Sequence, residues 1–394
     1  MQAQGIPAST LRMTPAMVTL FAFCCGAIVA NLYYAQPIID LIAPDIGLSP
    51  TAASLTVSLT QIGYAIGLFF IVPLADLVEN RRLLIATTLL SVACLGIATV
   101  VRDPFVFLAV SLLIGFASVS VQILVPLAAH FAPDASRGRI VGNVMGGLML
   151  GILLSRPFSS FVADHFGWHA VFGTATVFMI AISVLFAWLM PRRQPDHRAT
   201  YASLLRSLGT LVARLPPLRR RSFYQGCMFA SFSLFWTAAP LELTQHYGYS
   251  QSQIAVFALI GALGAIAAPV AGRMADAGYT RSGTLAALIF AAAGYWPVAL
   301  VPSLGVVGMI FTGVLLDFCV QMNMVLGQRE VYALDAASRG RLNALYMTSV
   351  FIGGALGSLI ASPLYAHSGW RGVVVAGSVF PLLALLRFGL ARMR

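Results

Sequence analysis

The chain has 394 residues, of which 24 are basic and 13 acidic, so that only 9% of its side chains carry formal charge. Soluble globular proteins carry about 25% charged residues. Because 59% of this chain is hydrophobic, its composition argues against a soluble enzyme. The net charge of +11 comes entirely from arginine, since the chain has no lysine. In a soluble domain it would suggest nucleic acid as a partner, so its meaning depends on where the arginines lie.

Apolar segments of about twenty residues recur along the chain, and each is long enough to cross a hydrocarbon layer of about 30 Å. Such segments form helices, because a backbone in lipid must satisfy its own hydrogen bonds. We therefore predict an all-α, multi-pass membrane protein. Twelve transmembrane helices are expected, near residues 15–40, 52–75, 83–101, 105–129, 138–162, 169–190, 222–245, 251–275, 282–301, 304–328, 339–366 and 371–390.

The arginines mark one side of the predicted membrane. If successive loops alternate between the two sides, 21 of the 24 arginines fall on the same side. Arg102 and Arg371 fall on the opposite side, and Arg156 lies within a span. Because positively charged loops stay in the cytoplasm, both termini are expected to be cytoplasmic, in the cell inner membrane. The charge then reflects topology, and nucleic acid is not expected as a partner.

No cofactor and no metal are expected. The five cysteines all lie in apolar segments, without the spacing of a disulfide framework or a zinc site. A phosphate-binding loop of the G-x-x-x-x-G-K-S/T kind is missing from the sequence. The first apolar segment follows polar residues and has no convincing cleavage site, so we interpret it as a span and not as a signal peptide.

A long cytoplasmic segment, residues 191–221, divides the predicted spans into six and six. Residues 1–190 and 222–394 are each expected to form a six-helix bundle. Between Leu204 and Leu215 apolar residues recur at helical spacing, which indicates a short amphipathic helix in the membrane interface. The alternative is a mobile linker that holds the two halves together.

The two halves share one design. The sequence Ala-Ser-Arg-Gly-Arg occurs at residues 135–139 and again at 337–341, and the same shift of 202 residues superposes Gly151 on Gly353. Parallel repeats with a binding site at their interface are typical of secondary transporters.

Residues 272–281 read GRMADAGYTR, and a degenerate copy about 200 residues earlier contains Asp76 and Arg81. The later segment looks like the G-x-x-x-D-x-x-G-x-R loop of the major facilitator superfamily, with its second glycine, Gly278, one position early. In the earlier copy Val72 and Glu79 stand where the two glycines of the motif would be. The resemblance extends over essentially the whole chain. It implies two rocking six-helix bundles and an Asp/Arg loop that helps to latch the cytoplasmic side in the outward-open state. The candidate gate residues are Asp76, Arg81, Arg82, Gly272, Asp276 and Arg281.

A narrower resemblance is carried by residues 31–37 (NLYYAQP) and by the Gly-Trp pair after the fifth span, which are similar to the bacterial drug and sugar efflux branch. For the gate arginines, an alternative is that they only enforce topology. The acidic residues Asp76 and Asp276 favour gating, since topology has no use for acids there.

Polar side chains avoid every third span. The third, sixth, ninth and twelfth have no Asn, Gln, Asp or Glu in their membrane stretches, so these four are expected to face lipid. The other eight are expected to surround a polar path. The candidate residues for the substrate cavity and for proton coupling are Asp317, Arg156, Asn31, Tyr34, Gln36, Gln61, Tyr64, Gln122, Trp236, Glu242, Gln321 and Asn323.

Two charges within the spans carry the functional prediction. Asp317 lies about 13 residues, or ~20 Å, into the tenth span, where a short side chain cannot reach either interface. It must be protonated, paired or in water, and could exchange a proton; alternatively it holds helices together. Arg156 is either a cation held by Asp317, Glu242 or Asp40, or a ligand for an anionic substrate, or a side chain that extends to the interface.

The leading hypothesis is a secondary transporter that exports small organic molecules against proton influx, as a monomer in the lipid bilayer. Proton-exchanging members of the family usually carry an arginine four residues before a glycine in the fourth helix. Here Ser111 precedes Gly115 at that distance, so proton coupling rests on Asp317 with Arg156. The alternatives are an uptake carrier for an organic anion and a non-transporting receptor or scaffold. An enzyme is not expected, because the spans hold no catalytic spacing.

Overall fold

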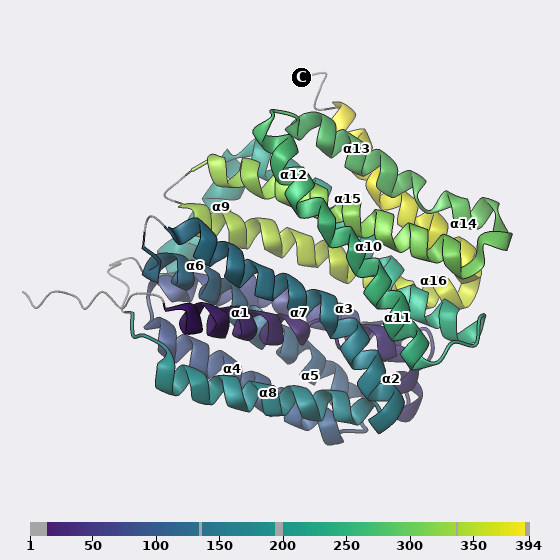
Figure 1. Cartoon of the computed structure of the whole chain (residues 1–394), viewed down its shortest axis with the longest axis horizontal. Coiled ribbons are helices and arrows are strands. Elements are labelled where there is room, and N and C mark those ends of the chain that lie inside the picture. Colours follow the sequence, from purple (N-terminus) through teal and green to yellow (C-terminus); the bar gives the residue numbers. More distant parts are fainter. Residues whose placement is uncertain (1–13, 134–135, 194–199, 336–337, 391–394) are drawn as a thin grey trace, which may run out of the picture.

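Helices make up all the regular structure in the part of the chain that the computed structural model describes, residues 14–133, 136–193, 200–335 and 338–390 (Figure 1). The α-helices are α1 (Pro15–Ala30), α2 (Ile39–Asp45), α3 (Leu55–Phe70), α4 (Asn80–Val100), α5 (Pro104–Ala117), α6 (Val121–Phe131), α7 (Arg137–Phe166), α8 (Trp168–Leu189), α9 (Tyr201–Arg214), α10 (Pro216–Gln245), α11 (Gln251–Gly261), α12 (Ala267–Asp276), α13 (Thr280–Ala293), α14 (Trp296–Leu300), α15 (Gly305–Ala333) and α16 (Arg339–Leu390). Short 3-10 helices join several of them: η1 (Gln36–Ile38), η2 (Val72–Asp76), η3 (Ser118–Ser120), η5 (Ala262–Ile266) and η6 (Pro302–Leu304).

Each range in which the sequence predicts a span is occupied by helix. Within the described residues, 8 continuous helical stretches are long and apolar enough to cross a membrane, judged by length and composition. Several predicted spans consist of consecutive helices; the fourth, for example, is made of α5, η3 and α6. The all-α class is thus confirmed for the described residues. The total of twelve spans and the cytoplasmic side of the termini stay predictions, and both terminal segments lie outside the described residues.

Two glycines with positive φ interrupt what would otherwise be continuous helices. Gly167, with φ of 80°, separates α7 from α8, and Gly369, with φ of 58°, divides α16 into two helical parts. Only glycine adopts this backbone without the steric cost of a Cβ. The two positions are 202 residues apart and each precedes a tryptophan. The turn between the fifth and sixth predicted helices is therefore built in the same way in both halves.

The helices α1 to α8 are called here the first half, and α10 to α16 the second half. In the first half α1 packs on α7, and in the second half α10 packs on α16. At both crossings the backbones touch: a Cβ on Gly151 would lie 2.2 Å from the carbonyl oxygen of Gly26, and one on Gly353 would lie 2.0 Å from that of Gly226. Small residues allow such close approach of helices. The repeat thus extends to the packing of the backbone.

Helix α9 lies in the segment between the halves. One of its faces, which includes Leu204, is buried. The hydroxyl of Tyr201 donates to the carbonyl oxygen of Phe70 at 2.8 Å, and Arg341 of α16 donates to Ser207 at 2.8 Å. An amphipathic helix therefore connects the halves and contacts both of them. The division of the chain into two bundles stays a prediction.

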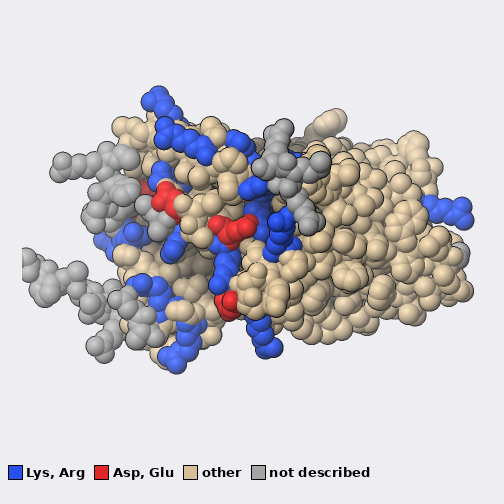
Figure 2. Space-filling view, turned by 90° about the horizontal axis from the view of Figure 1, so that it is seen from above, with Lys and Arg blue, Asp and Glu red and all other residues tan. Residues whose placement is uncertain are grey.

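Basic side chains gather over one end of the molecule, called here the arginine-rich end, while the rest is nearly uncharged in the same view (Figure 2). Large apolar side chains are exposed along α4, α8, α13 and the part of α16 after Gly369, for instance Leu89, Val177, Phe290 and Leu386. These helices are the third, sixth, ninth and twelfth predicted spans. Their exposed apolar surface agrees with the predicted contact with lipid.

Candidate functional site

A cavity of about 580 Å³ lies between the two halves. Pockets of several hundred Å³ are suited to small organic molecules. Its walls come from α1 and the turn after it, from α3, α6, α7, α10, α11, α12 and α15, and from the part of α16 before Gly369. Among the described lining residues, none lies on α4, α8 or α13 or beyond Gly369. The distribution of polar side chains along the sequence predicts this arrangement, in which the third, sixth, ninth and twelfth spans do not line the cavity.

The cavity extends to the arginine-rich end of the molecule. Arg156, about two-thirds of the way along α7, and Asp317, near the middle of α15, lie on its wall. The exposed residues Arg339 and Gly340, at the start of α16, lie at its mouth. Most of the lining between these points is apolar, with the side chains of Met145, Met149 and Phe351 among others. The polar groups are thus few and placed at definite positions along an apolar channel.

Polar contacts join the two halves away from that mouth. Asp40 of α2 accepts hydrogen bonds from Thr244 at 3.2 Å and from Gln251 at 3.1 Å. Ser58 of α3 and Ser358 of α16 share a hydrogen bond of 3.0 Å. Each of these contacts links the first half to the second. The structure therefore presents its cavity to the arginine-rich end.

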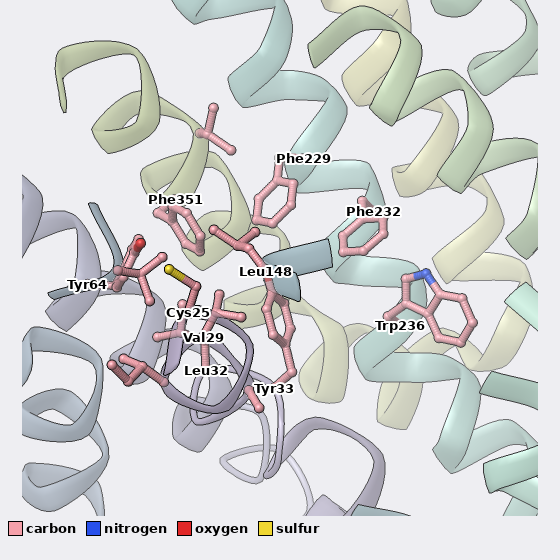
Figure 3. Close-up of a cluster of buried hydrophobic side chains, with 14 of the residues drawn as sticks. Cys25, Val29, Leu32, Tyr33, Tyr64, Leu148, Phe229, Phe232, Trp236 and Phe351 are labelled. Atoms are coloured by element: carbon pink, nitrogen blue, oxygen red, sulfur yellow. The ribbon is translucent and has the colours of Figure 1, made fainter. Parts of the chain in front are cut away.

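Arg156 is buried, with 5% of its surface exposed, and faces the cavity. Its Nε donates to Oε1 of Gln36 at 2.9 Å. Its guanidinium carbon lies 5.1, 5.1 and 4.7 Å from the ring centres of Tyr33, Phe232 and Trp236, and aromatic faces attract a cation. Figure 3 labels these three rings. Its Nη2 is buried without a hydrogen-bond partner among the described residues. A guanidinium held in this way can bind oxygen atoms of a ligand.

A tryptophan contacts both Asp317 and Arg156. Trp236 Nε1 donates to Oδ1 of Asp317 at 2.7 Å, and the face of the same indole covers Arg156. Asp317, Glu242 and Asp40 are the acids that the sequence suggests as partners of Arg156, but the side chain that binds it is the neutral Gln36. The two charges therefore share one cavity without forming a direct ion pair.

Gln36 and Trp236 occupy equivalent positions in the two halves, 200 residues apart. Gln36 holds Arg156, and Trp236 holds Asp317. Gln36 Nε2 also donates to Thr237 Oγ1 of the second half at 3.1 Å. The repeat thus supplies one supporting side chain for each charge, although the charges themselves are not repeated.

A second polar group lies on the cavity wall nearer its mouth. Gln122 Nε2 donates to the hydroxyl of Tyr64 at 3.1 Å, and Asn343 Nδ2 donates to Oε1 of Gln122 at 3.1 Å. Tyr332 in turn donates to Oδ1 of Asn343 at 2.8 Å. This chain of hydrogen bonds crosses from the first half to the second: the predicted cavity residues Tyr64 and Gln122 bond to each other, and Gln122 is linked to two side chains of the other half.

Two predicted cavity residues are instead directed at helices of their own half. Asn31 Nδ2 lies 3.5 Å from the sulfur of Met179, between α1 and α8. Asn323 Nδ2 donates to Oε1 of Gln225 at 2.6 Å, between α15 and α10. Neither Asn31 nor Asn323 is among the residues that line the cavity. These amides hold helices together, the use that buried polar groups commonly have in membranes.

Two further predicted residues also lie off the cavity wall. Glu242 accepts a hydrogen bond from the hydroxyl of Tyr365 at 2.8 Å, within the second half. Gln61 donates to Ser233 at 2.9 Å and so joins α3 to α10. Glu242 therefore contacts a neighbouring helix of its own half, whereas Gln61 belongs to the polar contacts between the halves.

The last two predicted cavity residues differ from each other. Tyr34 is buried against the ring of Phe158, at 5.9 Å between ring centres, and its carbonyl oxygen accepts from Ser159 at 2.6 Å. Gln321 lines the cavity, and its Nε2 lies 3.9 Å from the sulfur of Met149 on the opposite wall. Gln321 is thus placed to meet a ligand, and Tyr34 packs α1 on α7.

The gate residues of the second half make their contacts within that half. Asp276 forms an ion pair with Arg329 at the end of α15, and both side chains are exposed. Arg281 lies over the ring of Phe388, near the end of α16, at 5.8 Å. Gly272 has open space around the position of a Cβ. In this form of the protein, with its cavity open at the arginine-rich end, these contacts do not connect the halves.

The first-half copy behaves similarly. Arg81 donates to the carbonyl oxygen of Ala187 near the end of α8, and Arg82 pairs with Glu79 at 3.1 Å. Asp76 is exposed. Arg81 and Arg281, which the repeat makes equivalent, therefore both rest on the end of the last helix of their own half. A cation at a helix C-terminus is favoured by the helix dipole.

The ring of Phe232 belongs to the site, although the sequence analysis does not single it out. Phe232 lies four residues before Trp236 on α10, and its ring covers Arg156 from the second half. The spacing of four, which puts two side chains on the same face of a helix, is a signal that could have found it. It was overlooked because phenylalanines are common in every span and carry no polar group.

Comparison with known proteins identifies the family. The family model described as Major Facilitator Superfamily matches residues 18–222 and again residues 221–393. The chain is 38% identical over 378 residues, 95% of each chain, to a protein of Escherichia coli O157:H7 named "Uncharacterized transporter YgaY". It is 33% identical over 367 residues to "Probable transporter SCO4007" of Streptomyces coelicolor, covering 91% of this chain and 84% of the other.

Among solved structures, a POT family transporter crystallised with 5-aminolevulinic acid matches 94% of this chain and 95% of its own, with a TM-score of 0.76 and 12% identity. At that identity the likeness concerns the fold alone. The repeated match of the family model, one copy for each half, agrees with the repeat seen in the helix crossings at Gly151 and Gly353. The chain is therefore a membrane transporter and belongs to the major facilitator superfamily.

Proposed function

We propose that this transporter is a secondary carrier that exports small organic molecules by alternating access, driven by proton influx, with Asp317 as the site of protonation. In this proposal twelve helices form two six-helix bundles that rock about the cavity, and both termini lie in the cytoplasm of the bacterial cell. The Asp/Arg loops latch the cytoplasmic side, and the protein belongs to the drug and sugar efflux branch. The single observation that carries it is the carboxyl of Asp317 on the wall of a cavity shared by both halves.

The position of the cavity fits loading of substrate from the cytoplasm. Its mouth lies at the arginine-rich end, which the distribution of positive charge assigns to the cytoplasm. Substrate would load there, among apolar side chains and a few polar groups. Separation of the contacts of Asp40 and of Ser58 with the second half would then open the other side.

The chemistry of Asp317 supports coupling. An ionised aspartate in the middle of a membrane costs about 2.5–3.5 kcal/mol on insertion scales, so its charge must be compensated. Here the hydrogen bond from Trp236 and the nearby guanidinium of Arg156 compensate it. A ligand that disturbs either group changes how readily Asp317 takes up a proton, which is the requirement for exchange of substrate against protons.

The test is transport in proteoliposomes with an imposed pH gradient, across a panel of neutral, cationic and anionic substrates. Wild type should accumulate a substrate against its gradient when protons flow the opposite way. Asp317→Asn should abolish this accumulation but keep exchange of labelled for unlabelled substrate. Asp103→Asn is the matched control, because Asp103 caps α5 outside the cavity and asparagine caps equally well. Gradient-driven transport by Asp317→Asn would contradict the coupling role.

A second candidate, uptake of an organic anion together with a proton, is favoured by the free Nη2 of Arg156. A substrate carboxylate bound there would add a negative charge beside Asp317, and protonation of Asp317 would compensate it. Anion and proton would therefore bind together. The two functions predict opposite effects of pH on substrate binding. Acid pH should strengthen binding of an anionic substrate in the uptake carrier and weaken substrate binding in the exchanger.

A further inference from the structure

We infer that Trp236 is a positioning residue whose contact with Arg156, between the two halves, depends on the protonation of Asp317. The inference rests on the proposed proton coupling and adds the means by which a proton affects the contact between the halves. It is carried by the geometry of one indole ring that touches both charges of the cavity.

The two contacts of Trp236 use different parts of the ring. Its edge, at Nε1, donates to Asp317 at 2.7 Å, and its face lies 4.7 Å from the guanidinium carbon of Arg156. Figure 3 shows Phe232 and Trp236 extending from α10, with Tyr33 on the other side, after α1. The hydrogen bond to Asp317 therefore fixes the orientation in which the indole face meets Arg156.

The contacts belong to different halves. Trp236 and Asp317 lie on α10 and α15, in the second half, whereas Arg156 and its partner Gln36 lie in the first. The hydrogen bond of Trp236 is thus internal to one half, and its ring contact with Arg156 crosses to the other. Whatever changes the hydrogen bond also changes a contact between the parts that must separate.

Protonation of Asp317 changes that hydrogen bond. A donor bound to a carboxylate forms a charge-assisted bond, about twice as strong as one to a neutral acid. The indole face is also more negative while its N–H points at an anion, since linked polar groups polarise one another. When Asp317 takes up a proton, the edge contact weakens, and the ring is held less firmly against Arg156. The halves are then released from each other at this point.

The other groups around Asp317 do not replace Trp236. Charged and titratable side chains that interact with it electrostatically are Arg156 of α7, Tyr33 after α1, and Tyr295 before α14. The ring of Tyr33 is directed at Arg156, and the hydroxyl of Tyr295 is bound to Ser231. Arg156 interacts with Asp317 through its charge alone, whereas Trp236 contacts both groups, so a change of the hydrogen bond at Asp317 reaches the opposite half through Trp236.

The test compares two aromatic residues of α10 in the full-length protein. Trp236→Phe keeps a ring beside Arg156 but removes the N–H, whereas Phe232→Leu removes a ring beside Arg156 and leaves Asp317 with its donor. Transport rate and KM are measured from pH 5 to 9 in proteoliposomes. Trp236→Phe should move the pH of half-maximal transport upward by about one pH unit, because the ionised carboxylate loses its donor. Phe232→Leu should raise KM and leave the pH profile in place.

A double variant completes the test. With Asp317→Asn already present, Trp236→Phe should add no further change to the pH profile. Equal displacement of the profile by Trp236→Phe and Phe232→Leu, or displacement by neither, would overturn the inference. A pH-dependent Asp317→Asn variant would instead contradict the proposed proton coupling, so the two failures are distinguishable. Trp236→His, which restores a ring N–H, should return the profile toward that of wild type.

Discussion

Asp317 occupies in the second half the place that Gly115 occupies in the first, 202 residues earlier. A Cβ on Gly115 would lie 1.8 Å from the carbonyl oxygen of Thr60 on α3. At the equivalent crossing, Gly264 of η5 lies against Asp317: a Cβ on Gly264 would come within 2.3 Å of Cβ of Asp317. Where the first half has a tight glycine contact at Gly115, the second half therefore has Asp317, whose carboxyl lies on the cavity wall.

Gly264→Ala should displace Asp317. The added methyl group has no room, and overpacking of this kind costs about 1–3 kcal/mol. We expect a lower apparent melting temperature in detergent, by a few degrees, and a transport rate reduced more than the stability loss explains. Gly142→Ala is the control, because Gly142 has open space around its Cβ position. Equal effects of the two substitutions would argue against a special contact at Gly264.

Arg156→Lys should impair substrate binding although it keeps the charge. A lysine ammonium cannot donate to Gln36 through one nitrogen and offer others to a ligand in a planar fork. We expect KM to rise by about tenfold or more, with a smaller change in kcat, measured by initial transport rates. Arg102→Lys, at an exposed arginine in the loop before α5 and away from the cavity and the gate, should leave KM unchanged. A wild-type KM in Arg156→Lys would show that the substrate does not use the guanidinium.

Asp40→Ala should favour opening on the side away from the arginine-rich end. Asp40 accepts hydrogen bonds from two side chains of the second half, Thr244 and Gln251, and its removal leaves them without this partner. The measurement is the distance between spin labels placed on the loops of the two halves, which should lengthen. Asp45→Ala is the matched control on the same helix, since Asp45 contacts Trp168 within the first half. Unchanged distances in Asp40→Ala would show that other contacts keep this side closed.

Asp276→Asn tests whether the loop of Asp276 acts as a gate or only fixes the orientation of the protein in the membrane. The ion pair of Asp276 with Arg329 is exposed, and exposed pairs contribute only about 0–1 kcal/mol to stability. The apparent melting temperature should therefore hardly change. If the loop acts as a latch in another state of the cycle, the transport rate should still fall several-fold. A variant with normal rate and normal orientation in the membrane would support the interpretation that the charges of this loop only fix topology.

The helices and their repeat were accessible from the sequence because the constraints of the membrane are strong. The apolar length of each span, the breaks between spans and the repeat at residues 135–139 and 337–341 lead directly to the observed order of helices. The prediction that every third helix avoids the cavity also agrees with the structure. These inferences depend on period and composition, which the sequence displays directly.

The details of the site were less accessible. Arg156 and Asp317 stand out in a sequence because charge in a span is rare, and both line the cavity. The sequence does not show in which direction a neutral amide points. Asn31 and Gln36 lie five residues apart, yet Asn31 contacts Met179 and Gln36 binds Arg156. Which face of a helix meets the partner half is decided by tertiary packing, and a single sequence does not contain that information.

The glycine contacts described for the crossings of α1 with α7 and of α10 with α16 bear on how the protein can move. Where a backbone rests directly on a carbonyl oxygen, as Gly151 does on Gly26, there is no intervening side chain whose rotation would let one helix slide past the other. Each half is therefore internally stiff at these crossings. The conformational changes of a transport cycle must therefore occur elsewhere. They would involve hydroxyls, amides and aromatic rings that can exchange partners, such as those of Ser58, Gln61 and Trp236.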